Sequence, residues 1–218
     1  IGVRLVGSEM CIRDRYNVTI VCGPEVYDQN KLTVLPKSSL IAGVTTIRVK
    51  GIKENKANKL SRIRKFLLMS WRLYKASKKV INKGDKVLLV SNPFPLLILM
   101  AFHRKKMDYE ISFLAHDLFP EPLLMRFKLP NLVYRQCLNI FNRSYARMDK
   151  IISLGRDMTD VLREKTMPYN PNLEIIQIEN WGDINSIYPM DTHSDSDKIT
   201  IEYAGNMGKS QKLDALIE

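Results

Sequence analysis

A histidine and an aspartate stand next to each other in AHDLFPEPLL, residues 115–124, where an apolar run ends. A neutral imidazole can donate and accept hydrogen bonds near neutral pH, so His116 could contact a substrate hydroxyl or a reacting oxygen. Asp117 and Glu121 could act beside it as substrate-binding carboxylates. The same residues also suit a structural role, in which Asp117 caps a helix, His116 is packed, and Glu121 is an acid in the first helical turn.

A second stretch, GNMGKSQ at residues 205–211, has the composition of a phosphate-binding loop. Glycines allow backbone N–H groups to approach a diphosphate, and a following helix N-terminus and a lysine add positive charge. The stretch has neither the GxGxxG spacing of dinucleotide sites nor a Walker loop, so by itself it is a weak signal. The candidate diphosphate-binding residues are Gly205, Asn206, Met207, Gly208 and Lys209.

Short apolar, β-branched runs alternate with longer helical patterns along the chain. Strands are expected at residues 17–23, 43–51, 85–91, 109–117, 149–155 and 172–180. Helices are expected at 58–82, after Asn92 and Pro93, at 132–148 and at 156–165. A compact run such as DKVLLVS (85–91) is typical of a parallel strand that is buried on both faces. The alternation predicts an α/β domain with a mostly parallel sheet.

Parallel strands end at a common edge of the sheet, and ligands of doubly wound sheets bind there. Small and polar residues follow most of the expected strands. They are Gly23, Ser91-Asn92-Pro93, His116-Asp117, Ser153-Leu154-Gly155, Asn180-Trp181 and Gly205 to Gly208. This set predicts a ligand cleft at that edge, although strand ends also need turn residues for purely structural reasons.

The net charge of +11 is concentrated in one segment. Residues 48–83 hold 13 Lys and Arg residues and one acid, Glu54. The helix expected at 58–82 carries apolar residues at steps of three and four, which are Leu60, Ile63, Leu67, Trp71 and Tyr74. The sequence therefore predicts a basic amphipathic helix.

Basic amphipathic helices are typical of proteins that lie on anionic membranes. The cations expected to face such a membrane are Lys59, Arg62, Lys65, Arg72, Lys75, Lys78 and Lys79. An ordinary surface helix with a solvated basic face is the structural alternative. Nucleic-acid binding is a third interpretation, but no recognition motif accompanies the charge, so no nucleic-acid partner is expected.

Composition argues against several other classes. The longest apolar tract, around PFPLLILMAF (93–102), is shorter than the roughly 18 residues of a membrane-spanning helix. Three scattered cysteines suit a reducing cytoplasm better than a disulfide framework. No His and Cys cluster has metal-ligand spacing, so no metal site is expected.

The two ends of the chain differ from its middle. Residues 1–15 resemble a translated sequencing adaptor, because RLVGSEMCIRDR (4–15) has no hydrophobic period and matches one reading frame of a common transposon-end adaptor. They are expected to be an artefact without a native role. An N-terminal domain is expected at 16–187, without its first strand. Residues 188–197 have the composition of a linker, and 198–218 that of the first strand, glycine loop and helix of a second, truncated domain.

In their order along the chain, these pieces resemble a family 4 glycosyltransferase of GT-B fold, in the branch that acts in bacterial colanic acid, capsule and O-antigen synthesis. The matching stretches are SNPFP (91–95), HDLFPEPLL (116–124), IISLGRDMTDVL (151–162), IENWGDINSIYP (178–189) and ITIEYAGNMGKSQKLDALI (199–217). They cover nearly all of residues 17–218. The order of DLFPE, NWGD and YAGNMGKSQ is more specific than any one of them.

The resemblance implies two Rossmann-like domains, of which the first binds the acceptor and the second binds a nucleotide-diphosphate sugar. It implies a retaining transfer to a lipid-linked glycan by a peripheral protein at the inner face of the cytoplasmic membrane, without a metal or a tightly bound cofactor. His116, Asp117 and Glu121 would then lie near the reacting groups. Backbone N–H groups of the glycine loop, with Lys209, would stabilise the departing diphosphate.

The chain departs from the family pattern at two places. The first strand and glycine loop of the N-terminal domain are absent, and so is the rest of the donor domain, with its basic residue and paired glutamates. Lys212 also stands where this branch often has glycine. The 218-residue chain is therefore expected to be inactive by itself.

Two other functions are possible on the residues alone. A basic α/β module could bind a membrane or nucleic acid without catalysis. Such a module would not need the polar residues of HDLFPE (116–121) to face the glycine loop GNMG (205–208). A nucleotide-dependent epimerase or dehydrogenase would need GxGxxG after an early strand, and the sequence has none.

Overall fold

The computed structural model describes residues 16–23, 38–41, 44–52, 58–104, 106–122, 130–180 and 205. Within these residues the chain forms strands and helices in alternation. The strands are β1 (Thr19–Cys22), β2 (Ser38–Ile41), β3 (Val44–Arg48), β4 (Lys86–Val90), β5 (Glu110–Ala115), β6 (Lys150–Ser153) and β7 (Glu174–Gln177). The helices are α2 (Lys59–Val80), α3 (Pro95–Arg104), α5 (Asn131–Tyr145) and α6 (Arg156–Thr166).

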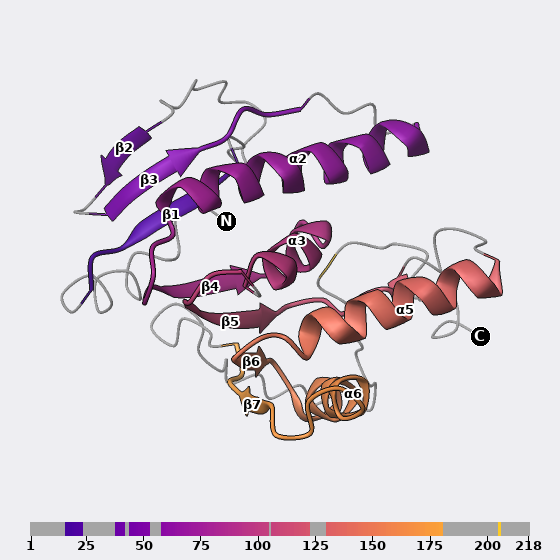
Figure 1. The fold of residues 1–218 in the computed structure, drawn as a ribbon. Coiled ribbons are helices and arrows are strands. Elements are labelled where there is room, and N and C mark those ends of the chain that lie inside the picture. The colour runs from indigo at the N-terminus through magenta and orange to yellow at the C-terminus, as the bar shows by residue number, and fades with distance from the viewer. Residues whose placement is uncertain are drawn as a thin grey trace, which may run out of the picture.

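The strands form two sheets (Figure 1). The larger sheet has the order β4-β5-β6-β7, and each neighbouring pair is parallel. The smaller sheet has the order β1-β3-β2, in which β1 is parallel and β2 antiparallel to β3. The predicted α/β class with a mostly parallel sheet is confirmed. Strand β2 was not predicted, because its sequence, SSLI, is short and has no clear alternation.

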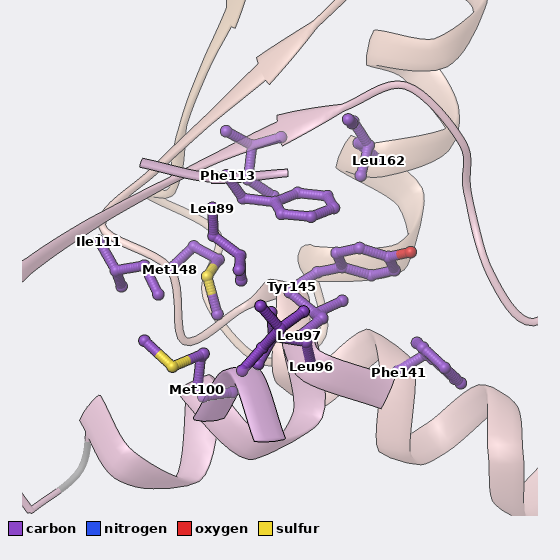
Figure 2. Close-up of a cluster of buried hydrophobic side chains, with 14 of the residues drawn as sticks. Leu89, Leu96, Leu97, Met100, Ile111, Phe113, Phe141, Tyr145, Met148 and Leu162 are labelled. Carbon is purple, nitrogen blue, oxygen red and sulfur yellow. The ribbon is translucent and has the colours of Figure 1, made fainter. Parts of the chain in front are cut away.

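The core lies between the larger sheet and the helices on one of its faces. Leu89, Phe113 and Ile151 occupy paired positions on β4, β5 and β6, and each is at most 6% exposed. Figure 2 shows Leu97 from α3 and Tyr145 from α5 beside Leu89 and Phe113. Paired residues of parallel strands point to the same face, so this face is covered by helices.

The opposite face of β4 is exposed. Leu88 is 59% and Val90 is 44% exposed, although both are apolar. The expectation that residues 85–91 are buried on both faces is therefore wrong for the described part of the molecule. The reason is that the described helices pack against one another in the series α2, α3, α5 and α6, so that they cover a single face.

Helix α2 begins where its sequence predicts. The side-chain oxygen of Asn58 accepts the backbone N–H groups of Leu60 at 2.9 Å and Ser61 at 3.4 Å, which is the usual N-cap arrangement. Met69 and Leu73 are buried and belong to the core. One face of α2 thus covers the interior of the molecule.

Most of the apolar residues from which α2 was predicted lie on a different face, although Tyr74 packs against the core. Leu60 is 74%, Leu67 is 55% and Trp71 is 45% exposed. Their spacing identified the helix correctly, but among the described residues nothing buries them. Helix α2 therefore carries two apolar faces, of which only the one with Met69 and Leu73 belongs to the core.

Several sequence-based expectations fall outside the described residues. They concern the adaptor-like residues 1–15, the linker at 188–197 and the second domain that begins at 198. In the last of these only Gly205 is described, as an exposed residue in a bend. The division into domains stays a prediction.

Candidate functional site

The candidate site lies where β4 and β5 end side by side. The hydroxyl of Ser91, directly after β4, accepts the backbone N–H groups of His116 at 3.3 Å and Asp117 at 3.2 Å, directly after β5. Ser91 is 3% exposed, whereas His116 and Asp117 are exposed. The predicted position of His116 and Asp117, at the carboxyl edge of the sheet and beside Ser91, is confirmed. Their chemical role stays a prediction.

Aromatic side chains hold the segment that follows Asp117. Phe94, which follows β4, stacks on Phe119, with ring centroids 4.4 Å apart and planes inclined by 23°. The hydroxyl of Tyr145 accepts the backbone N–H of Phe119 at 3.0 Å and donates to its carbonyl at 3.4 Å. Burial raises the pKa of Tyr145 well above its ordinary value, so the phenol stays protonated and keeps its donor.

Glu121 forms an ion pair with Lys165 of α6. The side chain of Lys165 is only 7% exposed, and a buried ammonium group is stable in a fold when an anion pairs with it. One carboxylate oxygen of Glu121 therefore has a structural role. The other oxygen, Oε2, is buried and has no hydrogen-bond partner among the described residues. That oxygen can accept a hydrogen bond from a ligand or from another part of the chain.

The residues at the end of β6 do not contribute to the candidate site. Ser153 is fully buried, and its hydroxyl shares a hydrogen bond of 2.6 Å with that of Thr159 in the first turns of α6. Thr159 also donates to the carbonyl of Gly155 at 2.9 Å. These contacts join β6 to α6, so Ser153 and Gly155 have a structural role here.

The predicted diphosphate loop is not described beyond its first glycine. Gly205 is exposed, and Asn206, Met207, Gly208 and Lys209 lie outside the described residues. Their position relative to His116 therefore stays a prediction.

The cations of α2 have different surroundings. Arg72 donates to the backbone carbonyls of Lys50 at 2.6 Å and Gly51 at 2.9 Å, so it holds the segment after β3 against the helix. The ammonium group of Lys75 lies 5.2 Å from the centre of the Trp71 ring, within the range of a cation–π interaction. Of the cations predicted to face a membrane, Arg72 thus also has a structural role.

In the part of the chain that the structure describes, no three His, Cys, Asp or Glu side chains are grouped to hold a metal ion. None of the described helices has the length and apolar character needed to cross a membrane. Cys22 and Cys137 are free thiols. Burial raises the pKa of Cys22, which the nearby Arg48 opposes in part, so that thiol is protonated at neutral pH.

The roles of three residues that position the candidate site were not predicted from the sequence. Ser91 was expected only as a strand-end residue, and Tyr145 and Lys165 were not singled out at all. Lys165 lies three residues, or about one helical turn, after the buried Leu162 and is itself 6% exposed. A lysine on the apolar face of a helix was the available signal, because such a residue needs a buried anion as its partner.

No family model matches this chain. The chain is similar to a protein of Pseudomonas aeruginosa named "Probable glycosyltransferase WbjE", with 27% identity over 147 residues. The match covers 62% of this chain and 36% of that protein, so the chain spans little more than a third of the length of its relative.

Proposed function

We propose that the chain is part of a glycosyltransferase that transfers a sugar from a nucleotide-diphosphate sugar to an acceptor. The observation that carries the proposal is the similarity over 147 residues to a protein named as a probable glycosyltransferase. The parallel sheet, with an imidazole and a carboxylate exposed at its carboxyl edge, supports it, because ligands of such sheets bind at that edge. In finer detail, the proposal is a family 4 enzyme of GT-B fold.

The proposed reaction retains the configuration of the transferred sugar. An acceptor hydroxyl attacks the anomeric carbon from the face that the diphosphate leaves, the bond from that carbon to the diphosphate oxygen breaks, and the hydroxyl proton passes to the departing diphosphate. His116 and Asp117 contact the sugar or the acceptor, and Glu121 accepts a hydrogen bond through Oε2. The loop from Gly205 to Lys209 stabilises the diphosphate through backbone N–H groups and positive charge, without a metal.

The proposed acceptor is a lipid-linked glycan of bacterial surface polysaccharide synthesis, and the protein works as a peripheral protein at the inner face of the cytoplasmic membrane. Helix α2 supports this location, since the exposed Leu67 and Trp71 lie near the exposed Lys75, Lys78 and Lys79. Each cation near an anionic membrane surface contributes about 1 kcal/mol to binding. Such a helix would keep the acceptor domain at the surface that holds its substrate.

The same helix also suits a second function, that of a basic α/β module that binds a membrane without catalysis. The two functions share the binding surface but differ at the carboxyl edge of the sheet. The exposed His116 and Asp117, held in place by Ser91, favour the enzyme, because a binding module has no need of an imidazole and a carboxylate at this edge.

The test uses the longer protein that contains these residues, together with UDP-, GDP- and dTDP-sugars and lipid-linked acceptors extracted from bacterial membranes. We expect release of nucleoside diphosphate that depends on the acceptor and is lost in His116→Ala. Arg135→Ala, a change at an exposed position on α5, serves as the matched control. A folded protein that binds anionic vesicles but releases no nucleoside diphosphate from any donor would be a binding module.

A further inference from the structure

Exposed apolar side chains are present on three neighbouring helices, not on α2 alone. They are Leu67 and Trp71 of α2, Phe102 of α3, and Val133 and Ile140 of α5, and each is between 44% and 55% exposed. Figure 1 shows the short α3 between the two longer helices, and it packs against both of them. A single apolar side chain in water is common, whereas a group of them on adjacent elements is typical of an interaction surface.

Ring contacts show that the exposed residues of α2 lie on the side of that helix toward α3. The ring of Trp71 lies 5.5 Å from that of Tyr74, and Tyr74 in turn contacts His103 of α3, with centroids 5.6 Å apart and planes inclined by 85°. Leu67 lies four residues before Trp71, which is one helical turn along the same side. The apolar stripe of α2 therefore continues onto α3.

A cation–π contact joins α5 to the same surface. The guanidinium carbon of Arg147, two residues after α5, lies 4.9 Å from the centre of the Phe102 ring. The backbone of Ala146 is still helical, and seven residues separate Val133 from Ile140 and Ile140 from Arg147. Seven residues correspond to about two helical turns. Val133 and Ile140 therefore lie on the side of α5 that faces Phe102 and α3.

The three helices contain no acidic residue. Neither Asp nor Glu occurs within the bounds of α2, α3 and α5, whereas α6 contains Asp157, Asp160 and Glu164. Cations stand next to the apolar residues, as in the contact of Lys75 with the Trp71 ring at 5.2 Å. The surface formed by α2, α3 and α5 is thus apolar and positively charged at the same time.

An anionic bilayer is the partner that fits both properties. Apolar side chains enter its acyl region, cations bind its headgroups, and no carboxylate on the three helices opposes them. A second copy that met this surface through its own would bring Lys75 and Arg147 of both copies together, without an acid from these helices to pair with them. A nucleic acid binds mainly through its phosphates and would leave Val133 and Ile140 without a partner.

We propose that α2, α3 and α5 together form one membrane-binding surface, which we call the three-helix surface. Its centre is the apolar group of Leu67, Trp71, Phe102, Val133 and Ile140. The inference rests on the membrane location in the proposed function and deepens it, because α2 then binds the membrane as one part of a wider surface and α5 inserts beside it.

The three-helix surface also fixes the orientation of the sheet. Its helices cover one face of the larger sheet, so binding through their outer side lays the strands along the membrane. In Figure 1, α2 and α5 begin beyond the ends of β4 and β5, on the side of the carboxyl edge. Leu60 and Leu132, in the first turns of these helices, are 74% and 71% exposed. The edge that carries His116 therefore opens beside the membrane, where a lipid-linked glycan reaches it while its lipid stays in the bilayer.

The first experiment measures which helices enter the bilayer. The 218-residue chain is mixed with vesicles of phosphatidylglycerol and a phosphatidylcholine that carries bromine on its acyl chains, because bromine quenches tryptophan fluorescence at short range. The two native tryptophans are removed by Trp71→Phe and Trp181→Phe, and one new tryptophan is introduced by Phe102→Trp, Ile140→Trp or, as the control on α6, Val161→Trp. Quenching is expected in the first two variants and not in the control. Bound chains without quenching at Phe102 and Ile140, or with equal quenching in all three variants, overturn the proposal.

The second experiment measures the contribution of α5 to binding. Val133→Gln with Ile140→Gln leaves the net charge unchanged and is expected to weaken the Kd for anionic vesicles about 10-fold, because two apolar side chains no longer leave water. Val161→Gln with Met167→Gln is the matched control, at exposed positions on and directly after α6, and should bind nearly as well as the parent chain. Circular dichroism and Tm confirm that both variants are folded. No weakening in the α5 variant, or equal weakening in both, contradicts the proposal.

The same proteins identify another occupant of the surface. If sedimentation shows that the parent chain is a dimer and Val133→Gln with Ile140→Gln makes it a monomer, a second copy covers the surface and the proposal is wrong. Neither experiment depends on sugar transfer. Vesicle binding through α5 without release of nucleoside diphosphate by the longer protein would refute the enzyme and support the surface, whereas turnover without vesicle binding would do the reverse.

Discussion

Asp117 and Ser91 are joined by a hydrogen bond between neighbouring strand ends, in which the backbone N–H of Asp117 donates to Ser91 Oγ over 3.2 Å. The N–H of His116 shares the same acceptor at 3.3 Å. One buried hydroxyl therefore holds the turn that exposes the two candidate side chains. Ser91 is a positioning residue, because its own hydroxyl is used within the fold.

Ser91→Ala is expected to lower the free energy of unfolding by about 1 kcal/mol, since two backbone N–H groups lose their acceptor. In the longer enzyme it should also lower kcat, because the His116 and Asp117 turn is no longer fixed. Ser153→Ala is the matched control, a buried strand-end serine whose hydroxyl bonds to Thr159 instead of to this turn. Urea unfolding and steady-state turnover check both effects. A similar fall of kcat in the two variants would mean that Ser91 acts only through general stability.

His116→Ala is expected to reduce turnover at least about 100-fold, the lower end of what a positioned acid or base contributes. Because His116 is exposed, the free energy of unfolding should change by no more than about 0.5 kcal/mol. Turnover of the longer enzyme and urea unfolding of both proteins are the measurements. Unchanged turnover would mean that His116 has no part in catalysis and only a structural role.

Glu121→Ala is expected to destabilise the fold by about 2 kcal/mol, because it leaves the ammonium group of Lys165 buried without an anion. Glu121→Ala with Lys165→Met should recover most of that loss, since the unpaired charge is then absent. If Glu121 also contacts a substrate, the double variant will be stable but inactive. Recovery of activity together with stability would show that the role of Glu121 is structural only.

Lys75→Glu with Lys79→Glu is expected to abolish binding to vesicles that contain anionic lipid, while the far-UV circular dichroism stays unchanged. Arg135→Glu with Arg156→Glu changes the net charge equally at exposed positions on α5 and α6 and should bind nearly as well as the parent chain. Binding should also weaken with salt, because exposed charges are screened over about 10 Å at 0.1 M. Equal binding to neutral and anionic vesicles, or to neither, would mean that α2 is an ordinary solvated helix.

The protonation of the buried His103 is expected to destabilise the fold at mildly acidic pH. It is 4% exposed, and burial, with the charges of Lys78 and Lys106, lowers its pKa below the ordinary value of 6.5. As pH falls, the unfolded chain therefore binds a proton at this histidine before the folded chain does. The contribution of His103 to the free energy of unfolding is complete above pH 6.5 and is lost as pH falls through the lower pKa of the folded state. The free energy of unfolding should decrease as pH falls below about 6.5, the ordinary pKa of histidine, and less so in His103→Gln. Equal slopes in urea titrations of the two proteins would contradict this.

Much of the local structure could be predicted from the sequence. Helix α2 was expected at 58–82 and is found at Lys59–Val80, and β5 was expected at 109–117 and is found at Glu110–Ala115. Helical and strand periodicities, and caps such as Asn58, act between residues close together in the chain, so they can be read without the fold. The placement of His116 and Asp117 at a strand end follows from the same local pattern.

Which surfaces are buried was decided only by the tertiary structure. The stripe of Leu60, Leu67 and Trp71 has the right spacing for a core face, yet Leu73 is buried instead, because α2 packs on α3 through its other face. Leu88 has the sequence of a doubly buried strand and is exposed, since the described helices cover one face of the sheet.

The partners that hold the candidate site were decided in the same way. Ser91 lies 25 residues from His116 along the chain, and Glu121 lies 44 residues from Lys165. No local pattern specifies such pairs, because they depend on which strands become neighbours and on how α6 packs beside them. The sequence by itself determined the elements and the chemical groups at their ends, whereas the packing of those elements determined which groups meet, because burial and hydrogen bonding depend on contacts between distant parts of the chain.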